Sequence, residues 1–161
     1  MDVIYIQGLD AVTRKLKILS NGRLARNAAN RAIRQSMKVV LNAAISNARA
    51  LNDPSTPKSI YKNIVYRQAR LKNKSLAMGR VGVLTGWKTY TQSKANIRKG
   101  LAGKKYQVGG DVFYWRFLEL GTEHMAAKPF MRPALQNNIS TVTNDFAGIF
   151  SAEIDKELAK L

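Results

Sequence analysis

The sequence predicts an α+β fold in which a small antiparallel sheet is packed by a long N-terminal helix and a long C-terminal helix. Apolar residues recur at helical spacing over Arg23–Ala50 and again from about Arg132 to the C-terminus. Two short strand-like runs lie between these helices. With 161 residues, 45% of them hydrophobic, the chain has the size of one domain, which we expect to span residues 1–161.

The N-terminal elements are predicted as a short strand and two helices. Val3–Ile6 is β-branched and aromatic, and apolar residues then recur at helical spacing from Leu9 to Leu19. An Asn-Gly pair at positions 21–22 is typical of a helix end. The longer helix Arg23–Ala50 has an alanine-rich apolar stripe, so we expect it to pack closely on a sheet or another helix.

A hairpin is predicted after that helix. Prolines at positions 54 and 57 end the helix, since they and the residues before them disfavour α geometry. Ile64–Leu71 and Leu76–Leu84 are candidate strands, and Lys72–Ser75 is the candidate turn. Gly79 and Gly82 lie inside the second strand, which indicates a bulge or the close approach of another backbone.

The remaining chain is predicted as a loop and two helices. Gly86–Gly110 is rich in Lys, Gly and polar residues, so we expect an extended basic loop that is either a functional arm or mobile when the protein is alone. We further expect this loop to order only in an assembly, because it has few apolar residues to bury. Asp111–Gly121 favours a short buried helix capped at Gly121 over a third strand. The C-terminal helix begins near Arg132, with Pro133 in its first turn, where a missing N–H costs nothing.

The charge is unevenly distributed. Residues 1–110 hold 22 of the 27 Lys and Arg and three of the ten acids, for a net charge of +19, whereas residues 111–161 have a net charge of −2. Such an excess indicates contact with nucleic acid, an anionic membrane or an acidic protein surface, or a solvated basic face. No run of apolar residues is long enough for a membrane span or a signal peptide, so we expect no membrane contact.

Catalytic patterns are missing from the sequence. With no cysteine and one histidine, the chain has no Cys- or His-based metal cluster, and neither a phosphate loop nor a nucleophile elbow is present. Glu119 and Glu123 are four residues apart, but Gly121 interrupts the helix that would align them. We therefore expect no enzyme and no catalytic, cofactor or metal site. His124 is expected to form hydrogen bonds within a loop. Glu119 is interpreted as a surface cap, or as an acceptor for the amides of Gly121 or Thr122 or for an arginine.

One motif resembles a known family. Tyr114-x-x-Phe117-x-Glu119-x-Gly121-Thr122 is followed by Met125-x-Ala127-x-Pro129-Phe130-Met131-Arg132-Pro133-Ala134-Leu135. This pattern resembles the signature of the tail-component or tail-completion family of long-tailed double-stranded-DNA bacteriophages. The opening Ile6-x-Gly8-Leu9-Asp10 followed by Lys15-Leu16 is similar too. The chain departs from the family at Asp53–Ile60, where relatives carry Pro-x-Asp-Thr-Gly-x-Leu, and in the Gly86–Gly110 loop.

The resemblance implies a structural virion protein of the phage neck or tail, which joins or completes the tail at the head-to-tail interface as part of a homo-oligomeric ring. Its implied partners are other phage neck and tail proteins, and it would be made in the host cytoplasm. The stretch from Phe117 to Leu135 is then a shaped connector, and Phe130 is either ordinary core or an interface anchor. The predicted subunit or partner interface comprises Glu119, Gly121, Thr122, Pro129, Phe130, Met131, Arg132 and Pro133.

A basic contact face is predicted separately. It comprises Arg26, Arg34, Lys38, Arg49, Arg67, Arg70 and Lys72. Its partner is either packaged DNA in the channel or carboxylates of a neighbouring ring, and the joining role of the family favours the carboxylates. The alternative function is a basic nucleic-acid-binding module, in which Trp87, Tyr90 and Tyr106 among Lys and Arg would stack on bases. No helix-turn-helix, zinc-finger or RNP-type pattern supports this alternative.

Overall fold

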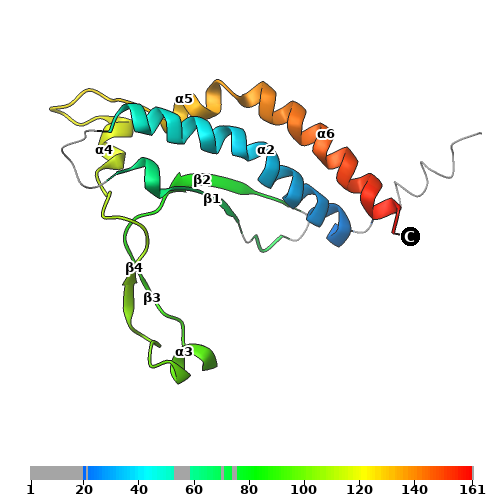
Figure 1. Cartoon of the computed structure of the whole chain (residues 1–161), viewed down its shortest axis with the longest axis horizontal. Helices are drawn as coiled ribbons and strands as arrows, with labels where there is room; N and C mark the ends of the chain where they lie inside the picture. Colours follow the sequence, from blue (N-terminus) through cyan, green and yellow to red (C-terminus); the bar gives the residue numbers. More distant parts are fainter. Residues whose placement is uncertain (1–19, 21, 53–58, 70, 74–75, 161) are drawn as a thin grey trace, which may run out of the picture. The chain divides into compact units, whose positions relative to one another are not determined.

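The computed structural model of the chain describes residues 20, 22–52, 59–69, 71–73 and 76–160. The predicted α+β class is confirmed by the long helices α2 (Gly22–Ala50) and α6 (Ile139–Leu158) and by two small sheets (Figure 1). The strand and the first helix expected within residues 3–19 lie outside the described residues. Contacts divide the chain, for which composition predicts one domain, into two compact units. Unit 1 contains Met1–Val39, Tyr66–Arg80 and Asn138–Leu161, and unit 2 contains Val40–Val65 and Val81–Asn137.

The predicted long helix is confirmed as α2. Its buried positions recur every four residues, and most of them carry small side chains: Ala28, Ala32, Ser36, Val40, Ala44 and Ala48. Four residues turn the helix by about 400°, so this stripe winds around α2 by about 40° per step. Small side chains at these positions let neighbouring elements approach the helix backbone closely.

The predicted hairpin is confirmed with shorter strands, β1 (Ile64–Gln68) and β2 (Gly79–Val83). Beside these strands, the Ala69 amide donates to Met78 and the Leu84 amide donates to Asn63, as in an antiparallel pair.

Gly79 is required in unit 1, but side chains rather than a backbone occupy the space beside it. A Cβ at Gly79 would lie 2.5 Å from the Tyr66 ring and 2.7 Å from the side chain of Ile33 on α2. Gly82 has nothing within 4 Å of the corresponding position, so no close approach explains that glycine.

Helix α6 packs along α2 in unit 1 (Figure 1). Ala28 and Ile154 are buried together, with Leu24, Phe150 and Leu158 packed around them. The sequence predicts one helix from about Arg132 to the C-terminus, but the helix is interrupted. A separate helix α5 (Met131–Gln136) ends at Asn137, and Asn138 caps α6 with φ −120° and ψ 8°, outside helical geometry.

Residues 86–110 are not the irregular loop that their composition predicts. Strands β3 (Trp87–Thr89) and β4 (Lys105–Gln107) pair in an antiparallel ribbon, with the short helix α3 (Lys94–Arg98) between them. Local hydrogen bonds close the turn, because Ser93 caps α3 and the Asn96 side chain donates to Thr91. Backbone pairing and capping therefore form this structure in a segment with few apolar residues, and the expectation that the segment orders only in an assembly stays a prediction. We call residues 86–110 the basic ribbon.

The short helix α4 (Trp115–Leu120) confirms the choice of helix over strand for residues 111–121 and ends at Gly121, which has φ +79°. The expectation that this helix is buried is wrong. Its buried residue is Glu119, while Phe117 and Leu120 are exposed. Burial selects the carboxylate because that side of α4 faces the start of α5, where backbone amides need an acceptor.

Candidate protein-interaction site

Glu119 is the centre of the connector between α4 and α5. One carboxylate oxygen, Oε2, accepts the backbone amides of Phe130 at 2.8 Å and Met131 at 2.9 Å. The other, Oε1, accepts the amide of Arg132 at 2.9 Å and its Nε at 3.3 Å. These amides belong to the first turn of α5, which has no intrahelical acceptors of its own for them. Glu119 thus acts as the N-terminal cap of a helix that begins twelve residues later, at Met131.

The carboxylate is held in its charged form although it is only 5% exposed. Burial raises the pKa of Glu119, but the hydrogen bonds from the amides of Met131, Phe130 and Arg132 and from the Arg132 side chain together lower it below its ordinary value. Charge-assisted bonds of this kind are about twice as strong as neutral ones. A charged acceptor with four donors therefore works as a rigid joint between α4 and α5.

The structure distinguishes among the interpretations of Glu119. It is not a surface cap, and it does not accept the amides of Gly121 or Thr122, which donate to Phe117 and Met125 instead. The expected arginine partner is confirmed as Arg132, whose guanidinium also donates to the backbone oxygen of Glu119. Because the amide partners lie in another helix, no local spacing in the sequence could identify them.

Gly121 lets the chain reverse after α4. Its φ of +79° and ψ of 175° lie in a region that is essentially restricted to glycine. A Cβ there would lie 2.9 Å from the backbone nitrogen of Ala127. Thr122 and Met125 then form an antiparallel bridge, in which the backbone amide of each donates to the carbonyl of the other. The backbone amide of Lys128 donates to the carbonyl of Leu118, which returns the chain beside α4.

The residues that enter α5 have different exposures. Phe130 is fully buried, so its side chain is core, and its carbonyl accepts the Asn47 side chain of α2 within unit 2. Pro129 and Arg132 are exposed, whereas Met131 and Pro133 are half-buried. Pro133 is the third residue of α5, as the first-turn prediction requires. The predicted interface is therefore brought together around Glu119, and only part of it reaches the surface.

Sequence analysis missed an exposed apolar face beside the connector. Phe113, Phe117 and Leu120 are 59%, 49% and 68% exposed. Phe113 lies in the turn that leads into α4, and Phe117 and Leu120, three residues apart, are neighbours on the surface of the helix. We call these three residues the apolar face of α4. The sequence signal was present in this spacing, but it was interpreted as a core pattern.

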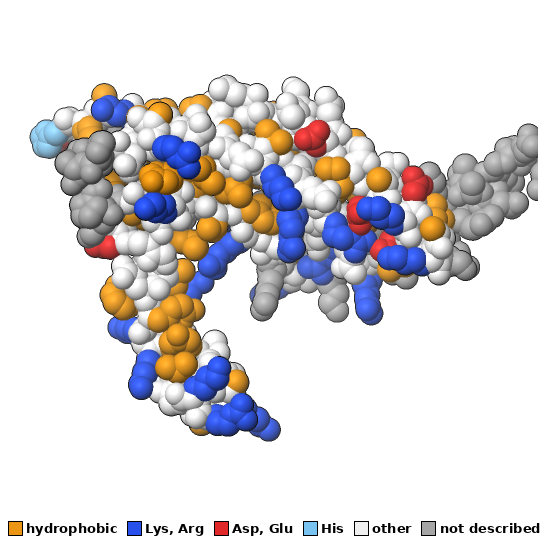
Figure 2. Space-filling view, in the orientation of Figure 1, with side chains coloured by type: hydrophobic (Ala, Val, Ile, Leu, Met, Phe, Trp, Pro, Cys, Tyr) orange, Lys and Arg blue, Asp and Glu red, His pale blue; other side chains and the backbone are white. Residues whose placement is uncertain are grey.

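The predicted basic contact face is divided between the units. Arg26, Arg34, Lys38, Arg67 and Lys72 belong to unit 1, Arg49 belongs to unit 2, and Arg70 lies outside the described residues. Arg26 has a buried Nε with no hydrogen-bond partner among the described residues, and the Arg49 guanidinium lies 5.1 Å from the Tyr61 ring centroid. Figure 2 shows Lys and Arg side chains over unit 1 and over the basic ribbon.

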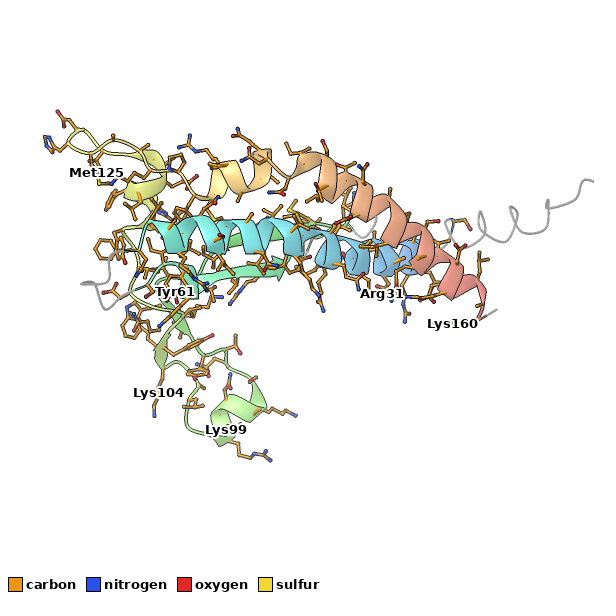
Figure 3. All side chains as sticks on the ribbon, turned by 45° about the horizontal axis from the view of Figure 1, so that its top comes forward. Arg31, Tyr61, Lys99, Lys104, Met125 and Lys160 are labelled. Atoms are coloured by element: carbon orange, nitrogen blue, oxygen red, sulfur yellow. The ribbon has the colours of Figure 1, made fainter. Side chains whose placement is uncertain are left out.

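A second charged cluster, which the sequence analysis did not single out, joins α2 and α6 in unit 1. Arg31 donates to Glu153 and, at 2.7 Å, to Glu157 (Figure 3). Lys156, one turn further along α6, binds Glu153, and Lys160, just past the end of α6, binds Glu157. Hydrogen bonds from Lys156 and then from Arg31 lower the pKa of Glu153, and those from Lys160 and then from Arg31 lower the pKa of Glu157. The two carboxylates are largely covered, as Glu119 is, but the three cations that bind them are exposed.

Other candidate chemistry has little support in the geometry. The amide of His124 donates to Thr122 Oγ1 at 3.3 Å in an exposed loop, and Glu123 is exposed. Within residues 20, 22–52, 59–69, 71–73 and 76–160, no group of His, Asp and Glu could hold a metal ion. Over the same part of the chain, no helix has the length and apolar character needed to cross a membrane.

Comparisons with known proteins identify no relative of this chain from which a function could be inferred. No protein-family model, no curated protein and no solved structure matches the chain.

Proposed function

We propose that this chain is a structural virion protein of the neck or tail of a long-tailed phage, where it joins or completes the tail as one subunit of an oligomeric ring. The resemblance of residues 114–135 to the tail-completion signature motivates the proposal. In this chain the motif has a structural role, because Glu119 holds the start of α5 and Gly121 turns the chain. Such a role suits a protein that assembles rather than one that catalyses.

The apolar face of α4 is the observation that carries the proposal. Two phenylalanines and a leucine lie exposed on, or just before, a short helix that a buried carboxylate fixes to the start of α5. Aromatic residues are enriched at protein interfaces, and clustered apolar side chains at a surface mark contact sites. Because Glu119 holds α4 rigidly, this face is preorganised for a neighbouring subunit or another neck protein.

Substituting the apolar face tests this proposal. F117S/L120S should reduce assembly, measured by size-exclusion chromatography with light scattering, while circular dichroism stays unchanged. The matched control is L76S/I139S, which removes two exposed apolar side chains from unit 1 and should assemble as the original chain does. A chain that stays monomeric at every concentration and is missing from purified particles of the phage that encodes it would refute the proposal.

The partner of the basic contact face is part of the same proposal. Carboxylates of a neighbouring ring are the favoured partner, and the pairing of Arg31 with two glutamates of α6 illustrates that chemistry on the same helix. R34A should then weaken assembly and leave the salt dependence of DNA binding unchanged. If Arg34 touches a phosphate instead, the slope of log K against log salt should fall by about 0.9 while assembly stays normal.

A further inference from the structure

The basic ribbon carries positive charge that no ion pair among the described residues balances. It carries six cations and no acid, and all six side chains are exposed: Lys88, Lys94, Arg98, Lys99, Lys104 and Lys105. None of the six forms an ion pair with another described residue. Figure 3 shows Lys99 and Lys104 on the ribbon with their side chains pointing outward. This exposed charge is available to attract an external anionic partner.

The strand register distributes aromatic rings and lysines over both faces of the basic ribbon. Lys88 pairs with Tyr106, and the Tyr90 amide donates to Lys104, so these residues share one face. The Tyr90 and Tyr106 rings lie 4.4 Å apart between the two lysines. The other face carries Trp87 opposite Gln107, followed by the pair of Thr89 and Lys105.

The second face contains a hollow lined by an aromatic ring, a hydroxyl group and a cation. These belong to Trp87, Thr89 and Lys105, and the volume of the hollow is about 490 Å³. Pockets of about 300–1,000 Å³ hold drug-sized ligands, a size class that includes a nucleotide. Trp87 is 67% exposed, so its ring is available for stacking. Lys105 supplies a cation for a phosphate, and Thr89 supplies a hydroxyl that can donate or accept.

We propose that the basic ribbon is a nucleic-acid-binding arm, in which lysines contact the phosphates of a DNA strand and Trp87 stacks on a base. Proteins that bind single strands combine a basic surface with exposed aromatic rings in this way, and a two-stranded ribbon also fits the major groove of a duplex. We favour DNA because Trp87 and Lys105 line one hollow, where a base can stack on the ring while its phosphate meets the lysine. Binding of an acidic protein is an outcome that the test below distinguishes. This site does not involve the apolar face of α4, so it can be tested independently of the proposed function.

The test uses the full chain with fluorescently labelled single-stranded and duplex DNA. Fluorescence anisotropy at several salt concentrations compares the original chain with K88A/K105A. The variant should reduce the slope of log K against log salt by about 1.4 for single strands and about 1.8 for duplex. R23A/R80A is the control, since it removes two exposed cations from unit 1 and leaves the same net charge. Equal slopes in the ribbon variant and the original chain, or equal losses in the ribbon variant and the control, would overturn the proposal.

Trp87 separates stacking from charge. W87A should reduce affinity for single strands by about 5- to 150-fold, with circular dichroism unchanged. A similar loss on duplex would place the ring in a groove, whereas a loss confined to single strands supports base stacking. Unchanged affinity on both forms of DNA would refute the role of Trp87. Poly-glutamate provides the remaining comparison, because binding as tight as that of DNA and equally sensitive to K88A/K105A would assign the basic ribbon to an acidic protein instead.

Discussion

Two charged contacts in this protein place carboxylates in similar surroundings but bind them to different kinds of donor. In unit 2, the buried Glu119 binds three backbone amides and Arg132. In unit 1, the side chains of Glu153 and Glu157 are only 12% exposed, but their partners are the exposed cations of Arg31 and two lysines. Removing the acceptor of backbone amides leaves those amides unsatisfied, whereas water solvates an exposed cation that loses its partner. The comparison teaches that the exposure of the donors bound to a carboxylate, rather than their number, decides its contribution to stability.

Glu119→Ala should have the largest effect. Three amides at the start of α5 lose their acceptor, and we expect the free energy of unfolding to fall by about 3–5 kcal/mol. Urea denaturation followed by circular dichroism measures the loss. Glu123→Ala, at an exposed glutamate four residues later, should change the free energy of unfolding little. Equal effects of the two variants would show that the buried cap has no special role.

The contact of Glu119 should also make the free energy of unfolding depend on pH in the acid range. Because folding lowers the pKa of Glu119, its contribution is complete above the unfolded value of about 4.3 and is lost as pH falls through the lower folded value. E119Q should cost about 1.5–3 kcal/mol at neutral pH and should flatten this acid dependence.

The pKa values of Glu153 and Glu157 are lowered as well, so their contribution to the acid dependence of stability must be separated from that of Glu119. At about 1 M salt the Debye length is about 3 Å, so the ion pairs of Glu153 and Glu157, whose cations are exposed, are screened more than the bonds from backbone amides to Glu119. Acid dependence that remains at this salt concentration, and that E119Q removes, belongs to Glu119. If high salt abolishes the acid dependence of the original chain, the surface cluster is its source and our interpretation is wrong.

Gly121→Ala tests the turn that positions the cap. The residue adopts φ +79° and ψ 175°, so a side chain is strained there by about 1–3 kcal/mol, with a further clash at Ala127. Gly148→Ala is a control of opposite sign, since that helical glycine has open space around it and alanine should stabilise α6 by up to about 1 kcal/mol. Thermal and urea midpoints should move in opposite directions for the two variants.

Arg31→Ala should have the smallest effect of these variants. It removes one exposed cation from two carboxylates that keep their lysines, and ion pairs with an exposed partner contribute little. The small difference from the original chain should disappear at about 1 M salt. A loss as large as that of Glu119→Ala would remove the distinction between the two contacts.

Several elements were predictable because their signals are local. The glycine at 121 ends α4 through its own backbone angles, and the alternation of residues 64–84 pairs β1 with β2. The interruption before α6 was missed, since an apolar stripe at helical spacing continues through Asn137 and Asn138. The basic ribbon was missed because hydrogen bonds of Asn96 and Ser93, rather than apolar burial, close it.

Helix and strand identity thus depended on neighbours within a few residues, where spacing, glycine and proline act directly on the backbone. Burial depended on residues far away in the chain. Tertiary structure alone placed Glu119 beside the amides of α5, turned Phe117 and Leu120 outward, and brought Arg31 to Glu153, 122 positions later. The physical reason is that hydrogen bonding and exclusion of water are properties of the assembled surroundings, which the amphipathic pattern of a six-residue helix does not specify.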